Sequence, residues 1–148
     1  MISFKLFVER ALGLIETVKF KDVGPVAAKV DSGNGAYNVL HGVNIQKHND
    51  GITFDTVGGK KLFKKVKEYI DINIGSGNIE KRPVVTFDIT IGNNHYPNTP
   101  FSIADRAQNE QKVLIGKDFI TKLGGLVDVT KTNNISKPTS SDLSQLKQ

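Results

Sequence analysis

The triplet Asp31-Ser32-Gly33 is the feature of this sequence best suited to chemistry. It follows the apolar run Val26–Val30, so a buried strand would present the Asp31 carboxylate at its end. Two carboxylates about 3 Å apart cannot both ionise easily and share one proton, so one can act as general base on a water molecule and the other as general acid. The run Asp55-Thr56-Val57 lacks the glycine, so the chain supplies one such triplet. A working pair therefore requires a two-fold homodimer.

The residues around this triplet predict a mainly β domain, because short β-rich runs alternate with Gly, Asn and Asp. Gly92-Asn93-Asn94 predicts a hairpin turn, since Gly and Asn tolerate positive φ. Residues 117–124 predict one short helix ended by Gly124. The expected strands are residues 16–21, 25–31, 38–46, 51–56, 68–75, 78–92 and 110–115, with a last strand at Val127 and Val129.

Two terminal segments differ from this β domain at residues 16–130. Residues 1–15 form the predicted N-terminal leader, because the apolar spacing over residues 2–15 fits an amphipathic helix that packs on its own domain or docks on a partner. Residues 131–148 are mostly Ser, Thr, Asn, Lys and Gln, so they can bury little surface to offset their ordering entropy. We therefore expect a flexible polar tail.

Four motifs together resemble a known family. They are Ala28–Gly33, the triplet Val39-Leu40-His41, the run Ile79–Val85, and Leu114–Lys117. In this order they are similar to the retropepsin-like aspartic peptidases, and above all to the bacterial and phage group labelled putative ATP-dependent zinc protease, or RimK-related. The resemblance covers roughly residues 13–129. It implies a single-domain, closed β-barrel with one short C-terminal helix.

The resemblance also assigns roles within the site. Asp31 would be the catalytic carboxylate, Ser32 would donate hydroxyl bonds across the dimer, and Gly33 would allow close backbone approach. The Gly-rich stretch from Ile74 to Gly77 falls where a flap over the substrate should lie, with an ordinary hairpin turn as the alternative. The candidate substrate-binding residues are Asn34, Gly35, Ile74, Gly75, Ser76, Gly77, Ile115 and Gly116. Asn34-Gly35 stands where the family usually has Ala-Arg, and Lys117 replaces Arg.

The sequence predicts no metal and no cofactor. It has no Cys and hence no thiolate zinc site, and His41, His48 and His95 lack His-Glu-x-x-His spacing. The glycine–lysine pairs lack the spacing of a phosphate-binding loop. No apolar run is long enough to predict a membrane span, so we expect a cytoplasmic protein, or a virion-associated one if it is phage-encoded.

The net charge of +5 allows a weak contact with polyanions through Lys60, Lys61, Lys64 and Lys65, although we favour the interpretation that these lysines form a solvated face over apolar residues. Two functions stay open. The first is a homodimeric aspartic endopeptidase acting on a peptide or protein substrate. The second is a catalytically silent binding or assembly module of the same fold, for example a phage virion component within a homo-oligomer or larger assembly.

Overall fold

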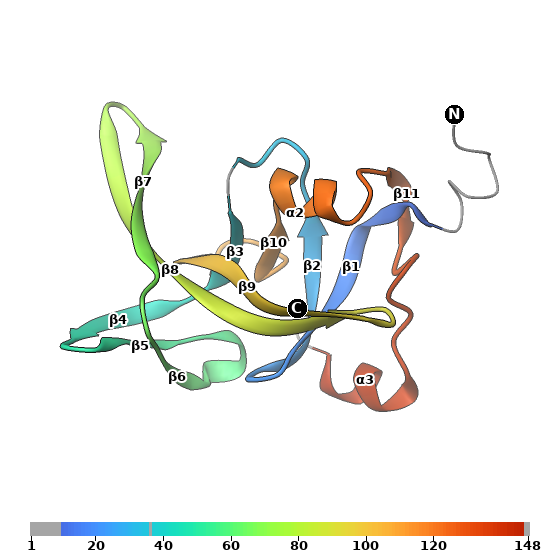
Figure 1. Cartoon of the computed structure of the whole chain (residues 1–148), viewed down its shortest axis with the longest axis horizontal. Coiled ribbons are helices and arrows are strands. Elements are labelled where there is room, and N and C mark those ends of the chain that lie inside the picture. Colours follow the sequence, from blue (N-terminus) through green and yellow to red (C-terminus); the bar gives the residue numbers. More distant parts are fainter. Residues whose placement is uncertain (1–9, 36, 147–148) are drawn as a thin grey trace.

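A computed structural model describes residues 10–35 and 37–146 of the chain, which form a mainly β structure (Figure 1). One sheet has the strand order β11-β1-β2-β10-β3-β9-β8-β7, and a smaller sheet has the order β4-β5-β6. An additional pairing of β1 with β8 closes the segment from β1 to β8 of the large sheet into a six-stranded barrel. The elements are β1 (Leu12–Phe20), β2 (Gly24–Val30), β3 (Asn38–His41), β4 (Val43–His48), β5 (Gly51–Asp55), a 3-10 turn η1 (Val57–Gly59), β6 (Lys61–Lys64), β7 (Glu68–Gly75), β8 (Asn78–Ile91), β9 (Asn94–Ala104), β10 (Val113–Ile115), α2 (Lys117–Lys122), β11 (Val127–Thr132) and α3 (Ser140–Gln145).

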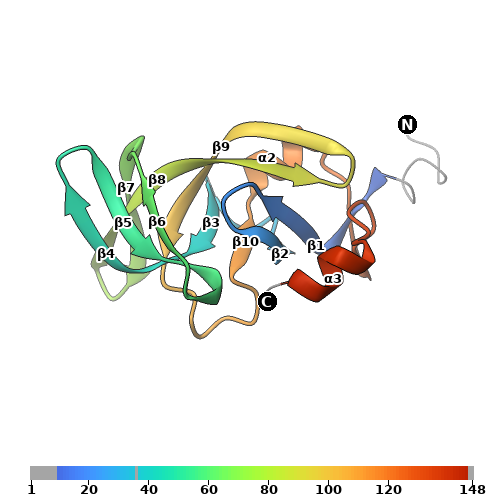
Figure 2. The ribbon, with the colours of Figure 1, turned by 90° about the horizontal axis from the view of Figure 1, so that it is seen from below.

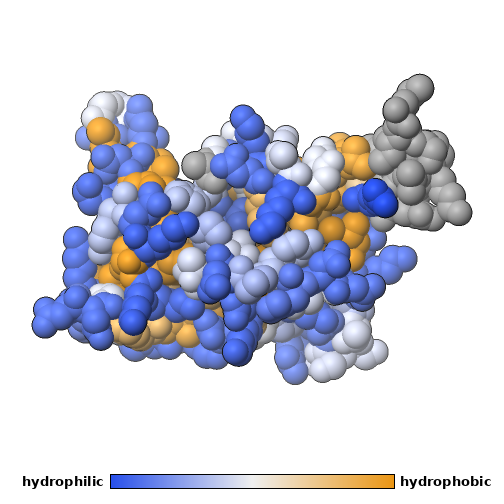
Figure 3. Space-filling view, in the orientation of Figure 1, coloured by the Kyte–Doolittle hydropathy of each residue, from blue (hydrophilic) through white to orange (hydrophobic). Residues whose placement is uncertain are grey.

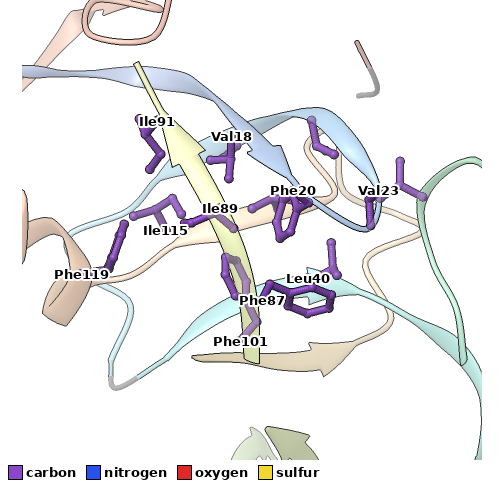
Figure 4. Packing of buried hydrophobic residues seen from close by; sticks show 14 of the residues in the cluster. Val18, Phe20, Val23, Leu40, Phe87, Ile89, Ile91, Phe101, Ile115 and Phe119 are labelled. Atoms are coloured by element: carbon purple, nitrogen blue, oxygen red, sulfur yellow. The ribbon is translucent and has the colours of Figure 1, made fainter. Parts of the chain in front are cut away.

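The barrel is filled by the inward-facing residues of its strands. Along β8 the side chains of Val85, Phe87 and Ile89 alternate with less buried residues, which is the period of two expected of a strand with one covered face. Phe87 also meets Phe20 and Phe101 with ring centroids 5.4 and 5.7 Å apart, both edge to face (Figure 4). These rings and the surrounding aliphatic side chains make a rigid base for the segments that leave the barrel.

The β7–β8 hairpin is the most prominent extension of the barrel (Figure 1). Its outer half is exposed, and its turn has positive φ at Gly75, Ser76 and Gly77. The β4-β5-β6 sheet lies beside the base of this hairpin in both views (Figures 1 and 2). Lys47 of β4 is 4.9 Å from the centre of the Tyr69 ring at the start of β7, which joins the two units.

Most of the predicted elements are present, with differences where the chain bends. The hairpin turn at Gly92 is confirmed, and the predicted helix is α2. The expected strand 38–46 is split into β3 and β4 at Gly42, where a Cβ would collide with the Ile103 side chain. The sequence analysis did not predict β6, β9 or α3.

The predicted N-terminal helix is wrong over residues 12–15 and lies outside the described residues over 2–9. Arg10 is helical, but the strand β1 begins at Leu12. Leu12 and Gly13 pair with Val127 and Asp128 of β11 in parallel, and Gly13 is so close to the Lys131 carbonyl that a Cβ would lie 2.5 Å from its oxygen. This pairing with a distant strand overrides the helical spacing of the apolar residues.

The tail also differs from the prediction, because residues 131–146 are folded against the barrel. Strand β11 runs to Thr132. The next segment, residues 133–136, which we call the strap, lies alongside β1, and its Asn133 N–H donates to the Ile15 carbonyl. The buried carboxylate of Glu16 accepts hydrogen bonds from the backbone N–H groups of Asn134, Ile135 and Ser136 and from the Ser136 hydroxyl. These polar contacts replace the hydrophobic burial that the composition of the tail lacks.

Candidate active site

The Asp31 carboxylate stands where two parallel strands end. Strand β2 stops at Val30, beside Ile115 of β10, and the Asp31 N–H donates to the Ile115 carbonyl at 2.9 Å. The Gly33 N–H donates to the Asp31 Oδ1 atom at 3.0 Å, and the Asn34 N–H donates to the Asp31 carbonyl at 3.2 Å. The carboxyl group is half-buried, whereas Ser32 and Gly33 are exposed. The chain thus turns tightly around one fixed carboxylate oxygen.

Gly116 supports this turn from the side. Its N–H donates to the buried Asn38 Oδ1 atom at 2.9 Å, and a Cβ on it would lie 3.1 Å from the Asn34 Nδ2 atom and 3.3 Å from the Gly35 carbonyl. The Lys117 N–H donates to the Asn34 carbonyl at 3.0 Å. The structure therefore brings together Asp31 to Gly35 and Ile115-Gly116, which we call the catalytic loop and its support.

The residues from Ile74 to Gly77 lie at the exposed tip of the β7–β8 hairpin, and within residues 10–35 and 37–146 no hydrogen bond or ion pair joins this tip to the loop. The hairpin tip and the loop after β2 rise from the same side of the molecule in the view of Figure 1. The hairpin is instead linked to the segment after the catalytic loop at its root, where the Tyr37 hydroxyl donates to the Glu68 Oε2 atom at 2.9 Å.

One charged group outside the four motifs, Arg106, lies close enough to Asp31 for their charges to interact. Burial lowers the pKa of the Arg106 guanidinium, the neighbouring Arg82 lowers it further, and the negative charge of Asp31 raises it. Arg82 in turn contacts Glu80, with its Nε atom 2.6 Å from the Glu80 Oε2 atom. Arg82 lies within the motif Ile79–Val85. No local sequence pattern predicts that Arg106 lies near Asp31, because the fold brings it there from the loop after β9.

His41 positions the loop after β9 that carries Arg106. Its Nδ1 atom accepts the Arg106 N–H at 2.9 Å, so the neutral ring carries its hydrogen on Nε2. Burial lowers the pKa of His41, and the nearby Asp105 carboxylate partly offsets this. The structure thus gives His41 a backbone partner in the Asp105–Lys112 connection. Lys112 holds the same connection, with its ammonium 2.6 Å from the Asn109 carbonyl.

Three of the four lysines proposed to meet polyanions have partners of their own. Lys64 forms an ion pair with Asp22 at 3.1 Å and lies 4.3 Å from the centre of the Phe87 ring, and Lys60 donates to the Asp22 carbonyl. Lys61 pairs with Asp55 at 3.1 Å. Polyanion binding through this strand stays a prediction, because these contacts are compatible with it but do not require it.

Within residues 10–35 and 37–146, no group of three His, Asp or Glu side chains is placed to hold a metal ion. Among these same residues, no helix is long and apolar enough to cross a membrane.

A closed barrel that presents Asp-Ser-Gly at the end of a buried strand, beside an apolar-apolar-Gly support and a short helix, defines the retropepsin-like class of aspartic peptidase folds. A family model described as RimB-like, retropepsin-like aspartic endopeptidase RimB, matches residues 11–138. The chain therefore belongs to the RimB-like family. The matched range includes the strap, which the sequence analysis had assigned to the tail.

A solved structure gives the same fold. It is the crystal structure of Lpg0085, a protein of unknown function (DUF785) from Legionella pneumophila, with 25% sequence identity and a TM-score of 0.66. The alignment covers 82% of this chain and 95% of the Legionella protein. No curated protein matches the chain significantly.

Proposed function

We propose that the protein is a homodimeric aspartic endopeptidase in which two Asp31 carboxylates activate a water molecule. The observation that carries this proposal is the placement of Asp31: the carboxylate ends a buried strand, one of its oxygens is fixed by the Gly33 N–H, and the parallel strand β10 holds its backbone. The sequence offers one Asp-Ser-Gly triplet, so the second carboxylate belongs to a second copy.

The chemistry follows from two such carboxylates sharing one proton. The ionised Asp31 takes a proton from water as the water oxygen attacks the carbonyl carbon of the peptide bond. The protonated Asp31 of the second copy gives its proton to the oxygen that was the carbonyl. The intermediate collapses as the nitrogen leaves with a proton from the first carboxyl group, while the second carboxylate takes a proton from a hydroxyl group of the intermediate, which restores one shared proton. We expect the fastest cleavage at mildly acidic pH.

The β7–β8 hairpin fits the role of a substrate cover. Ile74 and Ile79 expose 57% and 66% of their surface near its tip, although both are apolar. A peptide bound between this tip and the catalytic loop would bury these side chains and exclude water from the reacting atoms. Asn34 and Gly35 lie in the loop itself and would contact the substrate backbone.

The test is the substitution Asp31→Asn, which keeps an oxygen to accept the Gly33 N–H but removes the ionisable group. Cleavage of a library of fluorescence-quenched peptides should fall at least about 100-fold, the low end of what a general acid–base group contributes. The exposed turn residue Asp50 supplies the control, Asp50→Asn, which should cleave like the unmodified protein.

Sedimentation at micromolar concentration provides the second measurement, and we expect a dimer for the protein and for Asp31→Asn. An unchanged cleavage rate in Asp31→Asn would refute the assignment of Asp31. A folded monomer that cleaves no peptide in the library would refute the peptidase and favour the silent binding or assembly module.

A further inference from the structure

The Tyr37 hydroxyl donates a hydrogen bond of 2.9 Å to the Glu68 Oε2 atom, and these two residues are 31 positions apart in the sequence. Tyr37 directly precedes β3 and follows the catalytic loop, and Glu68 is the first residue of β7. The bond therefore runs from the segment that carries Asp31 to the root of the hairpin proposed to cover it.

Tyr37 is fixed to the catalytic loop on its own side. The Asn34 Nδ2 atom donates to the Tyr37 carbonyl at 3.0 Å, and the Asn34 N–H donates to the Asp31 carbonyl. The Tyr37 carbonyl also lies 3.1 Å from where a Cβ of Gly116 would be. The backbone of Tyr37 is thus held by Asn34, the same residue that donates to the Asp31 carbonyl.

Glu68 is equally well placed to control the hairpin. It pairs with Val84, which is fully buried, and the preceding Lys67 N–H donates to the Val84 carbonyl at 2.8 Å. From Glu68 to Gly75 the strand extends seven residue steps, or about 23 Å at about 3.3 Å a step. A rotation of about 10° at the root would therefore carry the tip through about 4 Å, close to the spacing of two hydrogen-bonded strands.

The root is held on both of its faces. Successive side chains of a strand point to opposite sides, so Glu68 reaches Tyr37 while Tyr69 points the other way and meets Lys47 of β4. Other polar contacts of the hairpin, such as the Lys81–Asp71 ion pair at 3.1 Å, join β7 to β8 and move with the hairpin as a unit. They stabilise the hairpin without setting its angle.

We propose that Tyr37 and Glu68 form a strut that sets the resting position of the β7–β8 hairpin over Asp31, which makes both of them positioning residues. This inference rests on the proposed function of the hairpin as a substrate cover. The hydrogen bond to Glu68 is also the largest cause that raises the pKa of Tyr37, followed by burial, so the phenol keeps the donated proton at neutral pH.

The first measurement reads the hairpin directly and needs no activity. Because the sequence has no Cys, the substitution Ile79→Cys gives a single site for a nitroxide label near the tip. Tyr37→Phe removes only the hydroxyl and keeps the ring, which lines a cavity of about 240 Å³ against Phe119. We expect a more mobile label in Tyr37→Phe, an unchanged label in Glu68→Gln, whose amide oxygen still accepts, and an unchanged label in the control Lys81→Met.

The second measurement is steady-state cleavage of the best peptide from the library. Losing one partly solvated hydrogen bond should raise KM by about 3- to 10-fold in Tyr37→Phe, with kcat within about twofold, because the substrate must then order the hairpin. Glu68→Gln should restore a KM close to that of the unmodified protein. If the Tyr37 hydroxyl only stabilised the fold, Tyr37→Phe would instead lower kcat and the midpoint of urea unfolding.

Two results would overturn the strut. The first is an electron paramagnetic resonance spectrum of the labelled Tyr37→Phe protein identical to that of the labelled parent. The second is a mobile label together with an unchanged KM, which would show that the hairpin angle does not govern substrate binding. Failure of the proposed function has a different signature, since the parent protein itself would then cleave nothing while the label could still report the strut.

Discussion

Glu16 is fully buried, and its substitution should be among the most damaging in the protein. Its two carboxylate oxygens accept hydrogen bonds from the N–H groups of Gly13, Asn134, Ile135 and Ser136 and from the Ser136 hydroxyl. These hydrogen bonds tie the start of β1 to the strap, which lies about 120 residues further along the chain. The substitution Glu16→Ala would remove the acceptor and leave its donors in place.

The size of the loss follows from these orphaned donors. A buried N–H without a partner costs about 1–3 kcal/mol, and four backbone N–H groups depend on Glu16. Because the strap can relax and admit water, we take the low end for each and expect a loss of about 4 kcal/mol in the free energy of unfolding. A domain of this size has about 5–15 kcal/mol in total. Glu16→Ala should therefore remove between about a quarter and about four-fifths of the total.

The assay is urea unfolding followed by far-ultraviolet circular dichroism, because the sequence has no Trp to provide a fluorescence signal. Protein concentration must be constant, since dimer formation would shift the midpoint. Glu16→Gln, which keeps one acceptor oxygen, serves if Glu16→Ala does not fold. Asp128→Ala is the matched control: this carboxylate also accepts an N–H and a hydroxyl, both from Thr130, but in an exposed position where water can replace it.

The reasoning would be refuted by a loss below about 1 kcal/mol in Glu16→Ala, the typical effect of any substitution. It would also be refuted by additivity with Ser136→Ala. Groups that share one hydrogen-bond network show coupling of about 0.5–3 kcal/mol in double-mutant cycles, so the second substitution should cost much less once the first is present.

Two further predictions concern pH and backbone geometry. The pKa of His41 is lowered from 6.5 by burial, so below pH 6.5 the unfolded chain takes up a proton that the folded chain refuses; stability should fall as pH drops from about 7 to 5. The slope should flatten in His41→Asn, which keeps an acceptor for the Arg106 N–H, and an equally steep slope there would contradict this account. Gly92 has φ of 62° and faces the Ile135 carbonyl, so Gly92→Ala should cost about 2 kcal/mol or more in urea unfolding. The control Gly75→Ala, also at positive φ but with open space around its Cβ, should cost about 1 kcal/mol, and equal losses would show that the strap does not press on residue 92.

The strands that line the barrel were predictable because their residues alternate and end at turn residues. Residues 78–92 are an example: Val85 to Ile91 follow a period of two, and Gly92 closes the run. Strand β9 escaped prediction because Pro97 and Pro100 interrupt it. The structure accommodates Pro97 beside a register shift, where Asn98 donates to the Asp88 carboxylate instead of to the β8 backbone.

Other features depend on contacts that no local pattern can reveal. Ala11, Leu14 and Ile15 have helical spacing, yet pairing with β2 and β11 makes the chain a strand from Leu12 onward. The strap is polar and reads as a tail, because its partner Glu16 lies at the other end of the chain. The site divides in the same way: Asp31, His41 and Gly116 lie in motifs, whereas Arg106, its contact with His41 and the Tyr37–Glu68 bond arise only through the fold.

Strand β8 has a mechanical consequence beyond its place in the barrel. It is one continuous strand of 14 residues whose Val84–Ile91 part lies against the core, while its Asn78–Lys81 part is exposed in the hairpin. A force applied at the tip therefore passes along one continuous backbone into the packed core. The hairpin resembles a cantilever that is fixed at the core and braced near its root by the Tyr37–Glu68 bond, so a load at the tip is felt first at this root.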